Sequence, residues 1–223
     1  MQSQFGLAIA SPHFYKRADV FAKKAERTYF RFMGNALNLP ADLPVPRDDG
    51  ACDHLQGTRI AELGLESTAG YPVNLAQLRG RTVVYCYPRT GQPDQPIPDG
   101  WDAIPGARGC TPQSCAFRDP FRDLTDAGAS HLFGLSTQDT EYQREVVKRL
   151  RLPYPLLSDR ELNFARALNL PTFRFNSMTL IKRLTLIIDD GCITKVFYPV
   201  FPPDQSAEQT LDWLTQSQPP KDS

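Results

Sequence analysis

A run of β-branched and aromatic residues, Thr82-Val-Val-Tyr-Cys-Tyr87, constrains the fold of this chain more than any other stretch. Gly80 and Pro88 bound the run, and most of its residues favour strands. Because the run does not alternate with charged residues, it is typical of a strand that is buried on both faces of a sheet. The run therefore predicts a central strand with layers packed on both sides, as in the α/β class.

The rest of the domain alternates between helical and strand patterns. We expect helices over 112–127, 140–150, 161–168 and 206–214, and strands over 131–136, 153–159, 180–188 and 192–198. Asp189-Asp190-Gly191 joins the last two strands as a hairpin turn, and 59–67 with 73–78 makes another hairpin ahead of the central strand. Strand, helix, strand, antiparallel hairpin and closing helix is the order of the thioredoxin-like fold, a central mixed sheet flanked by helices.

The 223 residues suit one domain with extensions. We assign 1–42 to an N-terminal extension, 43–217 to the thioredoxin-like domain and 218–223 to a polar tail. Within the extension, 20–33 combines helical apolar spacing with an excess of Lys and Arg. Three explanations stay open: an accessory helix, which we favour, an organelle-targeting segment, or a translation start at Met33.

Composition excludes several classes of function. Lys and Arg (25) balance Asp and Glu (25), so neither a nucleic acid nor a membrane surface is an expected partner. No apolar run approaches the length of a transmembrane helix. The scattered cysteines do not form a disulfide scaffold, and no secretory signal is visible, so we expect a reducing, cytoplasmic setting. They are Cys52, Cys86, Cys110, Cys115 and Cys192.

Cys110 stands at the predicted start of the first helix, with Thr111 as the expected N-cap and Pro112 as the first helical residue. A helix N-terminus favours an anion, and a cysteine there can have a lowered pKa and react as a thiolate. A long loop over 88–109, rich in Pro and Gly, runs into this cysteine, and such loops are usually functional. Cys110 is therefore the candidate reactive residue.

Cys115 follows five residues later, and its relation to Cys110 depends on where the helix begins. A zinc site is disfavoured because no further Cys or His cluster would complete four ligands. If the helix begins ahead of Cys110, the two Cα atoms lie about 8 to 9 Å apart. A disulfide tolerates about 7 Å, so bonding would require unwinding, and we favour this arrangement. If the helix begins only at Pro112, the two cysteines could approach each other directly.

The other cysteines have simpler expectations. Cys86 lies inside the central strand and is expected to be a buried, inert thiol. We expect the same of Cys192, whereas Cys52 lies in a loop-like segment and is expected to be exposed.

Two stretches, Val83-Val-Tyr-Cys-Tyr-Pro88 and Gly109-Cys-Thr-Pro-Gln-Ser-Cys-Ala-Phe-Arg-Asp119, resemble the peroxiredoxins. The similar type is peroxiredoxin Q, or bacterioferritin comigratory protein, of the alkyl hydroperoxide reductase C/thiol-specific antioxidant superfamily. The resemblance covers about 59–214. It implies a peroxidase without a cofactor or metal that reduces hydrogen peroxide and organic hydroperoxides.

The resemblance also implies roles for single residues. Cys110 matches the peroxidatic cysteine, which becomes a sulfenic acid, and Cys115 matches a resolving cysteine that forms an intramolecular disulfide. A thioredoxin- or glutaredoxin-like reductant would restore both thiols. Arg183 matches the arginine that favours the thiolate and binds the peroxide. Pro88 matches the proline that shields the site, and Gly109 belongs to the Gly-Cys-Thr turn.

Two features depart from the family pattern. Ala107 replaces the usual Thr or Ser three residues before the cysteine, so Thr90 or Thr111 is expected to supply the hydroxyl. The loop over 91–105 is longer than usual, and we expect Trp101 and its neighbouring prolines to wall the site and restrict substrate size.

Two other functions fit the same fold: a general thiol–disulfide oxidoreductase, and a redox-sensing module that uses the disulfide as a switch. A dedicated exchanger usually carries C-x-x-C, which this chain lacks. Arg183 and the Gly-Cys-Thr turn favour the peroxidase, because peroxide activation needs them. The resemblance implies a monomer rather than a dimer.

Overall fold

The computed structural model describes residues 39–93 and 95–217. Its strands are β1 (Gly64–Ser67), β2 (Val73–Asn74), β3 (Arg81–Cys86), β4 (Ala129–Ser136), β5 (Leu156–Ser158), β6 (Thr172–Phe175), β7 (Met178–Ile181), β8 (Leu184–Asp189) and β9 (Cys192–Phe197). Its helices are α2 (Cys110–Arg118), α3 (Phe121–Asp126), α4 (Thr140–Leu150), α5 (Asn163–Ala167), α6 (Ser206–Gln216) and the 3₁₀ helix η1 (Pro203–Gln205).

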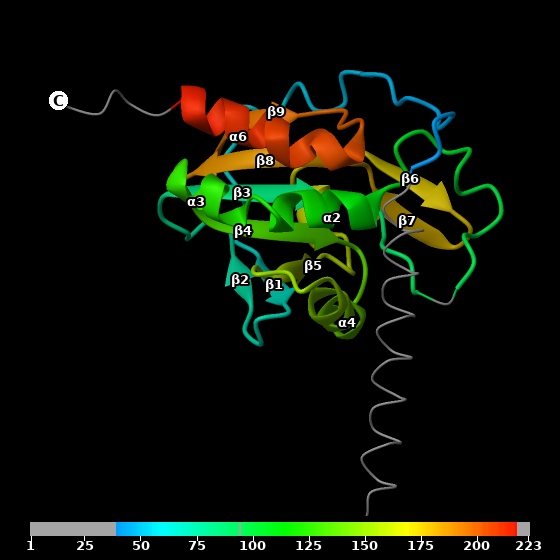
Figure 1. The fold of residues 1–223 in the computed structure, drawn as a ribbon. Helices are drawn as coiled ribbons and strands as arrows, with labels where there is room; N and C mark the ends of the chain where they lie inside the picture. The colour runs from blue at the N-terminus through cyan, green and yellow to red at the C-terminus, as the bar shows by residue number, and fades with distance from the viewer. Residues whose placement is uncertain (1–38, 94, 218–223) are drawn as a thin grey trace, which may run out of the picture.

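One mixed sheet organises the domain, with strand order β2-β1-β5-β4-β3-β8-β9 (Figure 1). Strand β3 pairs in parallel with β4 and antiparallel with β8. Val83 and Tyr85 of β3 enter one hydrophobic core, and Val84 and Cys86 enter the other. Both faces of β3 are therefore buried, which confirms the predicted central strand.

Helices cover the sheet unequally. On one face lie α2, α3, α4 and α6, whose apolar residues share a core with Val83 and Tyr85 (Figure 1). On the other face, α5 and the turns at 51–57 pack against Val84 and Cys86.

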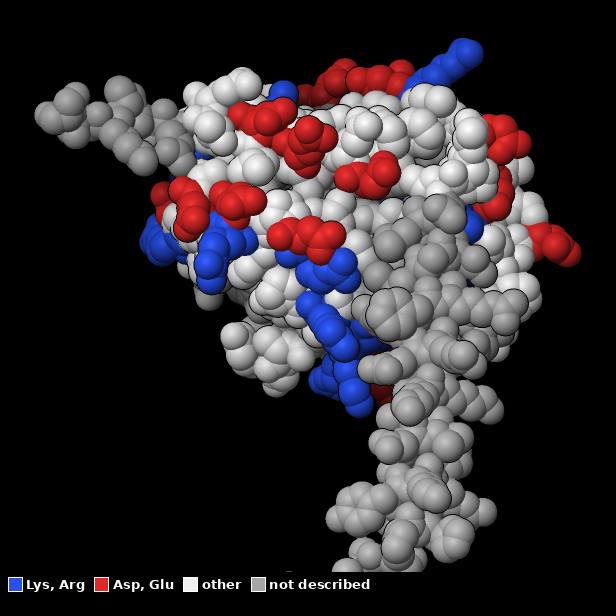
Figure 2. Space-filling view, in the orientation of Figure 1, with Lys and Arg blue, Asp and Glu red and all other residues white. Residues whose placement is uncertain are grey.

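Charged side chains are segregated on the surface, although the formal net charge is zero. Asp and Glu side chains gather over α6, and Lys and Arg side chains gather over α4 (Figure 2).

Several predicted elements are confirmed. The helix at 140–150 has the predicted bounds, with Asp139 as its N-cap. Strands β1 and β2 form the expected early hairpin, and β8 and β9 form the late one. The turn between β8 and β9 places Asp190 and Gly191 at positive φ, as a two-residue hairpin loop requires.

The predicted helix over 112–127 is wrong at its start and in its middle. It begins two residues earlier, at Cys110, because Gly109 adopts φ 100° as N-cap, and Thr111 lies inside the helix. It breaks before Phe121 because Pro120 has no N–H to continue the ladder. A left-handed glycine, and not Thr111, therefore sets the position of Cys110.

The predicted strand over 180–188 is also divided. Strand β7 ends at Ile181 and β8 begins at Leu184, so Arg183 lies in the short link between them. Strands β6 and β7 form an unpredicted hairpin of their own, with Asn176 at φ 52° in its turn. Asn tolerates the left-handed region, which was the available sequence signal.

The predicted extension helix over 20–33 and the tail at 218–223 lie outside the described residues. Among the residues that are described, no helix is long and apolar enough to cross a membrane.

Candidate active site

Cys110 occupies the first position of α2, immediately after the loop that follows β3, and its thiol is nearly enclosed at 3% exposure. Gly109 packs directly against Pro203, whose ring would clash with any side chain at that position. Two features therefore require glycine at position 109: its positive φ and its close contact with Pro203.

Sheet pairing brings Arg183 to Cys110. Strand β8 runs antiparallel to β3, and Leu184 lies opposite Cys86 at the end of β3 that leads to the site. Arg183, one residue before Leu184, therefore reaches the start of α2. Its Nη2 donates to Cys110 Sγ at 3.3 Å, although the two residues are 73 positions apart.

The backbone ahead of α2 and a glutamine inside it hold the Arg183 guanidinium. Nη2 also faces the carbonyl oxygens of Gly106, Ala107 and Arg108 at 3.0 to 3.3 Å, and Nη1 donates to Gln113 Oε1. These acceptors fix the guanidinium against the sulfur.

Arg183 carries its charge at only 3% exposure. None of the ion pairs among the described residues includes it. A buried cation without an anionic partner is costly, and a thiolate at Cys110 would supply the missing negative charge. Arg183 therefore presents a charged hydrogen-bond donor directly to the Cys110 sulfur.

Sequence reasoning missed Gln113. Its Nε2 donates to Ser206 Oγ at 3.3 Å, and Ser206 Oγ lies 3.3 Å from Thr185 Oγ1. Ser206 is the first residue of α6, with Gln205 as N-cap, and its hydroxyl belongs to this buried chain. The i, i+3 spacing of Cys110 and Gln113 was the signal that could have identified the glutamine.

Cys110 faces a pocket of about 590 Å³. Its wall is largely apolar, from Pro93, Pro96, Ile97, Pro98 and Trp101, with Arg89, Arg108 and Tyr142 adding polar groups. Trp101 is 6% exposed and packs on Phe173 and Phe175 of β6, with ring centroids 6.2 and 4.9 Å away. The long loop is thus anchored on the β6–β7 hairpin.

Both candidate hydroxyls line the same pocket. Thr90 is fully buried and its hydroxyl donates to Gln138 Oε1 at 3.1 Å. The hydroxyl of Thr111, in the first turn of α2, makes no comparable side-chain hydrogen bond among the contacts of the described residues. Pro88 is buried directly after Tyr87, and it does not line the pocket.

Cys115 lies in the same continuous helix as Cys110 and is 3% exposed. The alternative in which the helix begins only at Pro112 is therefore wrong. Helix geometry separates the two Cα atoms by about 8 to 9 Å, and both thiols are free. Burial raises the pKa of the Cys115 thiol, and the positive charges of Arg118 and Arg149 oppose that rise.

The remaining cysteines lie away from this pocket. Cys86 is fully buried, as expected. The expectation of an exposed Cys52 is wrong: its turn packs on the core, the residue is 7% exposed, and burial raises its pKa to about 12. Cys192 is only half-buried, and its Sγ lies 3.5 Å from the Gly57 carbonyl oxygen.

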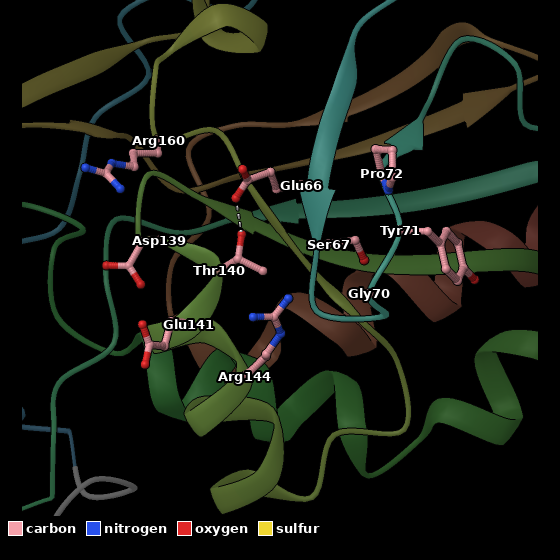
Figure 3. A pocket seen from close by; sticks show the side chains of 10 residues that line it. All are labelled: Glu66, Ser67, Gly70, Tyr71, Pro72, Asp139, Thr140, Glu141, Arg144 and Arg160. Atoms are coloured by element: carbon pink, nitrogen blue, oxygen red, sulfur yellow. Dashed lines mark hydrogen bonds between the residues drawn. The ribbon is translucent and has the colours of Figure 1, made fainter.

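A second pocket, of about 640 Å³, lies between the β1–β2 hairpin and the start of α4 (Figure 3). Thr140 Oγ1 donates to Glu66 Oε2 at 2.6 Å, and Arg144 and Arg160 face the same space. No cysteine lines it. Within 39–93 and 95–217, no group of three His, Cys, Asp or Glu residues could hold a metal.

Comparison with known proteins gives one consistent answer. The Redoxin family model matches residues 55–211. Chloroplastic peroxiredoxin Q of Gentiana triflora is 30% identical over 185 residues, covering 80% of this chain and 77% of that protein. Its counterpart in Sedum lineare is 32% identical over 161 residues, covering 71% and 77%. The crystal structure of peroxidoxin BcpB from Mycobacterium tuberculosis aligns with TM-score 0.58 and 26% identity, over 74% of this chain and 98% of that one.

Proposed function

This chain belongs to the Redoxin family and is a thiol-dependent peroxidase of the peroxiredoxin Q type, and on that premise we propose that Cys110 is its peroxidatic cysteine. The observation that carries the proposal is the hydrogen bond from buried Arg183 to Cys110 Sγ at 3.3 Å. That bond supplies fixed positive charge at the sulfur and at the oxygens that would bind beside it.

In the first step, the Cys110 thiolate attacks the terminal oxygen of a hydroperoxide. The S–O bond forms as the O–O bond breaks, the alkoxide or hydroxide leaves and takes up a proton, and the sulfur becomes a sulfenic acid. Arg183 donates to the peroxide oxygens as negative charge develops on them. Thr111 supplies the hydroxyl donor, because the proton of Thr90 is directed to Gln138.

In the second step, Cys115 resolves the sulfenic acid. The first turns of α2 unwind, since the helix otherwise holds the sulfurs apart. The Cys115 thiolate attacks Cys110 Sγ, the S–S bond forms, and the hydroxyl group leaves as water. A thioredoxin- or glutaredoxin-like dithiol then reduces the disulfide by exchange.

The pocket supports a range of small substrates. Its apolar wall accommodates the alkyl group of an organic hydroperoxide as well as hydrogen peroxide, and Trp101 limits the size of that group. The monomer stays a prediction from the family. The plant relatives are named as chloroplastic, which supports the organelle-targeting explanation of 1–42 over a purely cytoplasmic one. Mass spectrometry of the natural N-terminus would test it.

The peroxidatic role is tested by stopped-flow tryptophan fluorescence after one equivalent of hydrogen peroxide, with Trp101 as a reporter in the pocket wall. We expect rapid oxidation that is lost in Cys110→Ser and retained in the matched variant Cys115→Ser. Oxidation no faster than that of free cysteine would refute the proposal. Unchanged thioredoxin-coupled turnover in Cys115→Ser would refute the resolving role.

A further inference from the structure

Arg89 follows the end of β3 and lines the pocket that Cys110 faces. Its Nη1 donates to Met178 Sδ at 3.5 Å, and Met178 packs against the apolar cluster around Trp101. A thioether sulfur is a weak, uncharged acceptor. Among the described residues, the Arg89 side chain makes no other hydrogen bond and no ion pair. Its positive charge therefore lines the pocket without a counter-ion from that part of the chain.

The other two arginines near Cys110 already have partners. Arg183 donates to the sulfur itself. Arg108 also lines the pocket, and its Nη1 lies 3.4 Å from Asp102 Oδ1. None of the described residues that line the pocket is Asp or Glu. Helix α4 contributes Tyr142 to the wall, and Lys and Arg side chains gather over this helix (Figure 2). The pocket and its surroundings therefore attract anions.

The size and lining of the pocket suit a substrate much larger than hydrogen peroxide. Its volume of about 590 Å³ lies within the range of pockets that hold drug-sized organic molecules. Pro96, Pro98 and Trp101 form an apolar wall against which an alkyl chain can be buried. A negative group on such a chain would supply the counter-ion that Arg89 lacks. A carboxylate matches a guanidinium best, because two parallel N–H···O bonds can form between them.

We propose that Arg89 is a specificity-determining residue that selects organic hydroperoxides carrying a carboxylate, an inference that rests on the proposed peroxidase function and deepens it. The hydroperoxide group reacts at Cys110, the alkyl chain lies against Trp101 and its neighbouring prolines, and the carboxylate binds Arg89. The carboxylate takes no part in the bonds that form and break at the sulfur. Loss of its contact with Arg89 therefore lowers the second-order rate constant of oxidation by weakening binding.

The test compares oxidation of Cys110 by an ω-hydroperoxyalkanoic acid with its oxidation by the methyl ester of the same compound, at neutral pH. Each rate constant, from stopped-flow tryptophan fluorescence, is divided by that for hydrogen peroxide in the same protein. We expect the acid to react about tenfold faster than the ester in the wild type, as one charge-assisted hydrogen bond allows. The ratio should fall to about one in Arg89→Gln. The matched control is Arg160→Gln, which changes an exposed arginine of the second pocket and should keep the wild-type ratio. Equal ratios in the wild type and Arg89→Gln overturn the inference.

A second readout does not depend on peroxidase activity. In the Cys110→Ser background, the product alcohol, an ω-hydroxyalkanoate, is titrated by tryptophan fluorescence. Its affinity should fall about tenfold when Arg89→Gln is added, and an unchanged affinity overturns the inference even if Cys110 oxidises normally. If binding depends on Arg89 but wild-type Cys110 oxidises no faster than free cysteine, the peroxidatic role is refuted instead. If Arg89→Gln does not fold, as judged by circular dichroism, Arg89→Met removes the same charge, and the same results decide.

Discussion

Replacing Tyr154 with Phe should loosen the helix that separates the two cysteines. Tyr154 is buried, and its hydroxyl donates to the Ser114 carbonyl oxygen at 2.8 Å. The Tyr85 hydroxyl donates to Ser114 Oγ at 3.1 Å, and Ser114 Oγ donates to the Cys110 carbonyl oxygen at 3.1 Å. Ser114 lies between the two cysteines, so these bonds oppose the unwinding that the proposed resolving step requires.

The expected effect follows from the bonds that remain. In Tyr154→Phe, the Tyr85 hydroxyl keeps Ser114 Oγ, and the Ser114 carbonyl keeps its helical partner, so no buried group loses its last hydrogen bond. The variant loses two contacts of the Tyr154 hydroxyl, with the Ser114 carbonyl oxygen and with the Tyr85 hydroxyl at 3.2 Å. Only the first of these holds the helix, and one ordinary hydrogen bond contributes about 1 kcal/mol. Since about 1.4 kcal/mol is tenfold in an equilibrium constant, the unwound population should rise about fivefold.

Disulfide formation after a single peroxide equivalent, followed by rapid alkylation quench, should therefore accelerate about fivefold. Oxidation of Cys110 to sulfinic acid under excess peroxide should fall by a similar factor, because the sulfenic acid is consumed sooner. Tyr198→Phe is the matched control: it removes the bonds of the Tyr198 hydroxyl with Asp49 Oδ1, at 2.7 Å, and with Lys182 Nζ, at 3.2 Å, and touches no residue of α2 or of the pocket. An unchanged disulfide rate in a Tyr154→Phe protein that is measurably less stable would refute the reasoning.

Three further changes test other parts of the site. Arg183→Gln should slow Cys110 oxidation by about 10² to 10³, the usual loss for one preorganised donor; stopped-flow rates within about threefold of wild type would contradict the thiolate argument. Gly109→Ala should lower the free energy of unfolding by about 1 to 3 kcal/mol, because it places a side chain at φ 100° against Pro203; an unchanged urea midpoint would show that η1 can move aside. Deleting 91–103 should raise the ratio of cumene hydroperoxide to hydrogen peroxide turnover, and a constant ratio would exclude a role for Trp101 in size selection.

The fold could be predicted where local chemistry decided the structure. The β3 run, the Asp190-Gly191 turn and the amphipathic α4 each carry their own signal, and each is confirmed. A helix that includes both cysteines was the favoured arrangement, but its N-cap was not predicted, because the left-handed turn at Gly109 is accompanied by a tertiary contact with Pro203.

Less of the active site than of the fold could be predicted from the sequence. Nothing in the spacing of Cys110 and Arg183 predicts their contact, which depends on the pairing of β3 with β8. Family resemblance supplied that pair instead. Gln113 and Ser206 were missed because a polar residue in a helix's first turn and a serine at a helix start both have ordinary explanations. Only the folded chain shows that their side chains meet.

The near-complete enclosure of Cys110 has a consequence for the order of events. With 3% of the residue exposed, the reduced sulfur admits a small oxidant through the pocket but excludes a partner of protein size. In the proposed cycle, the electron donor would meet that sulfur only after the helix has opened and the pocket around Cys110 has been lost. The oxidant and the electron donor would therefore react with different conformers of the chain. High concentrations of the donor should then not inhibit the oxidation of Cys110. If the proposed cycle holds, the burial of this one thiol would set the order of the two half-reactions.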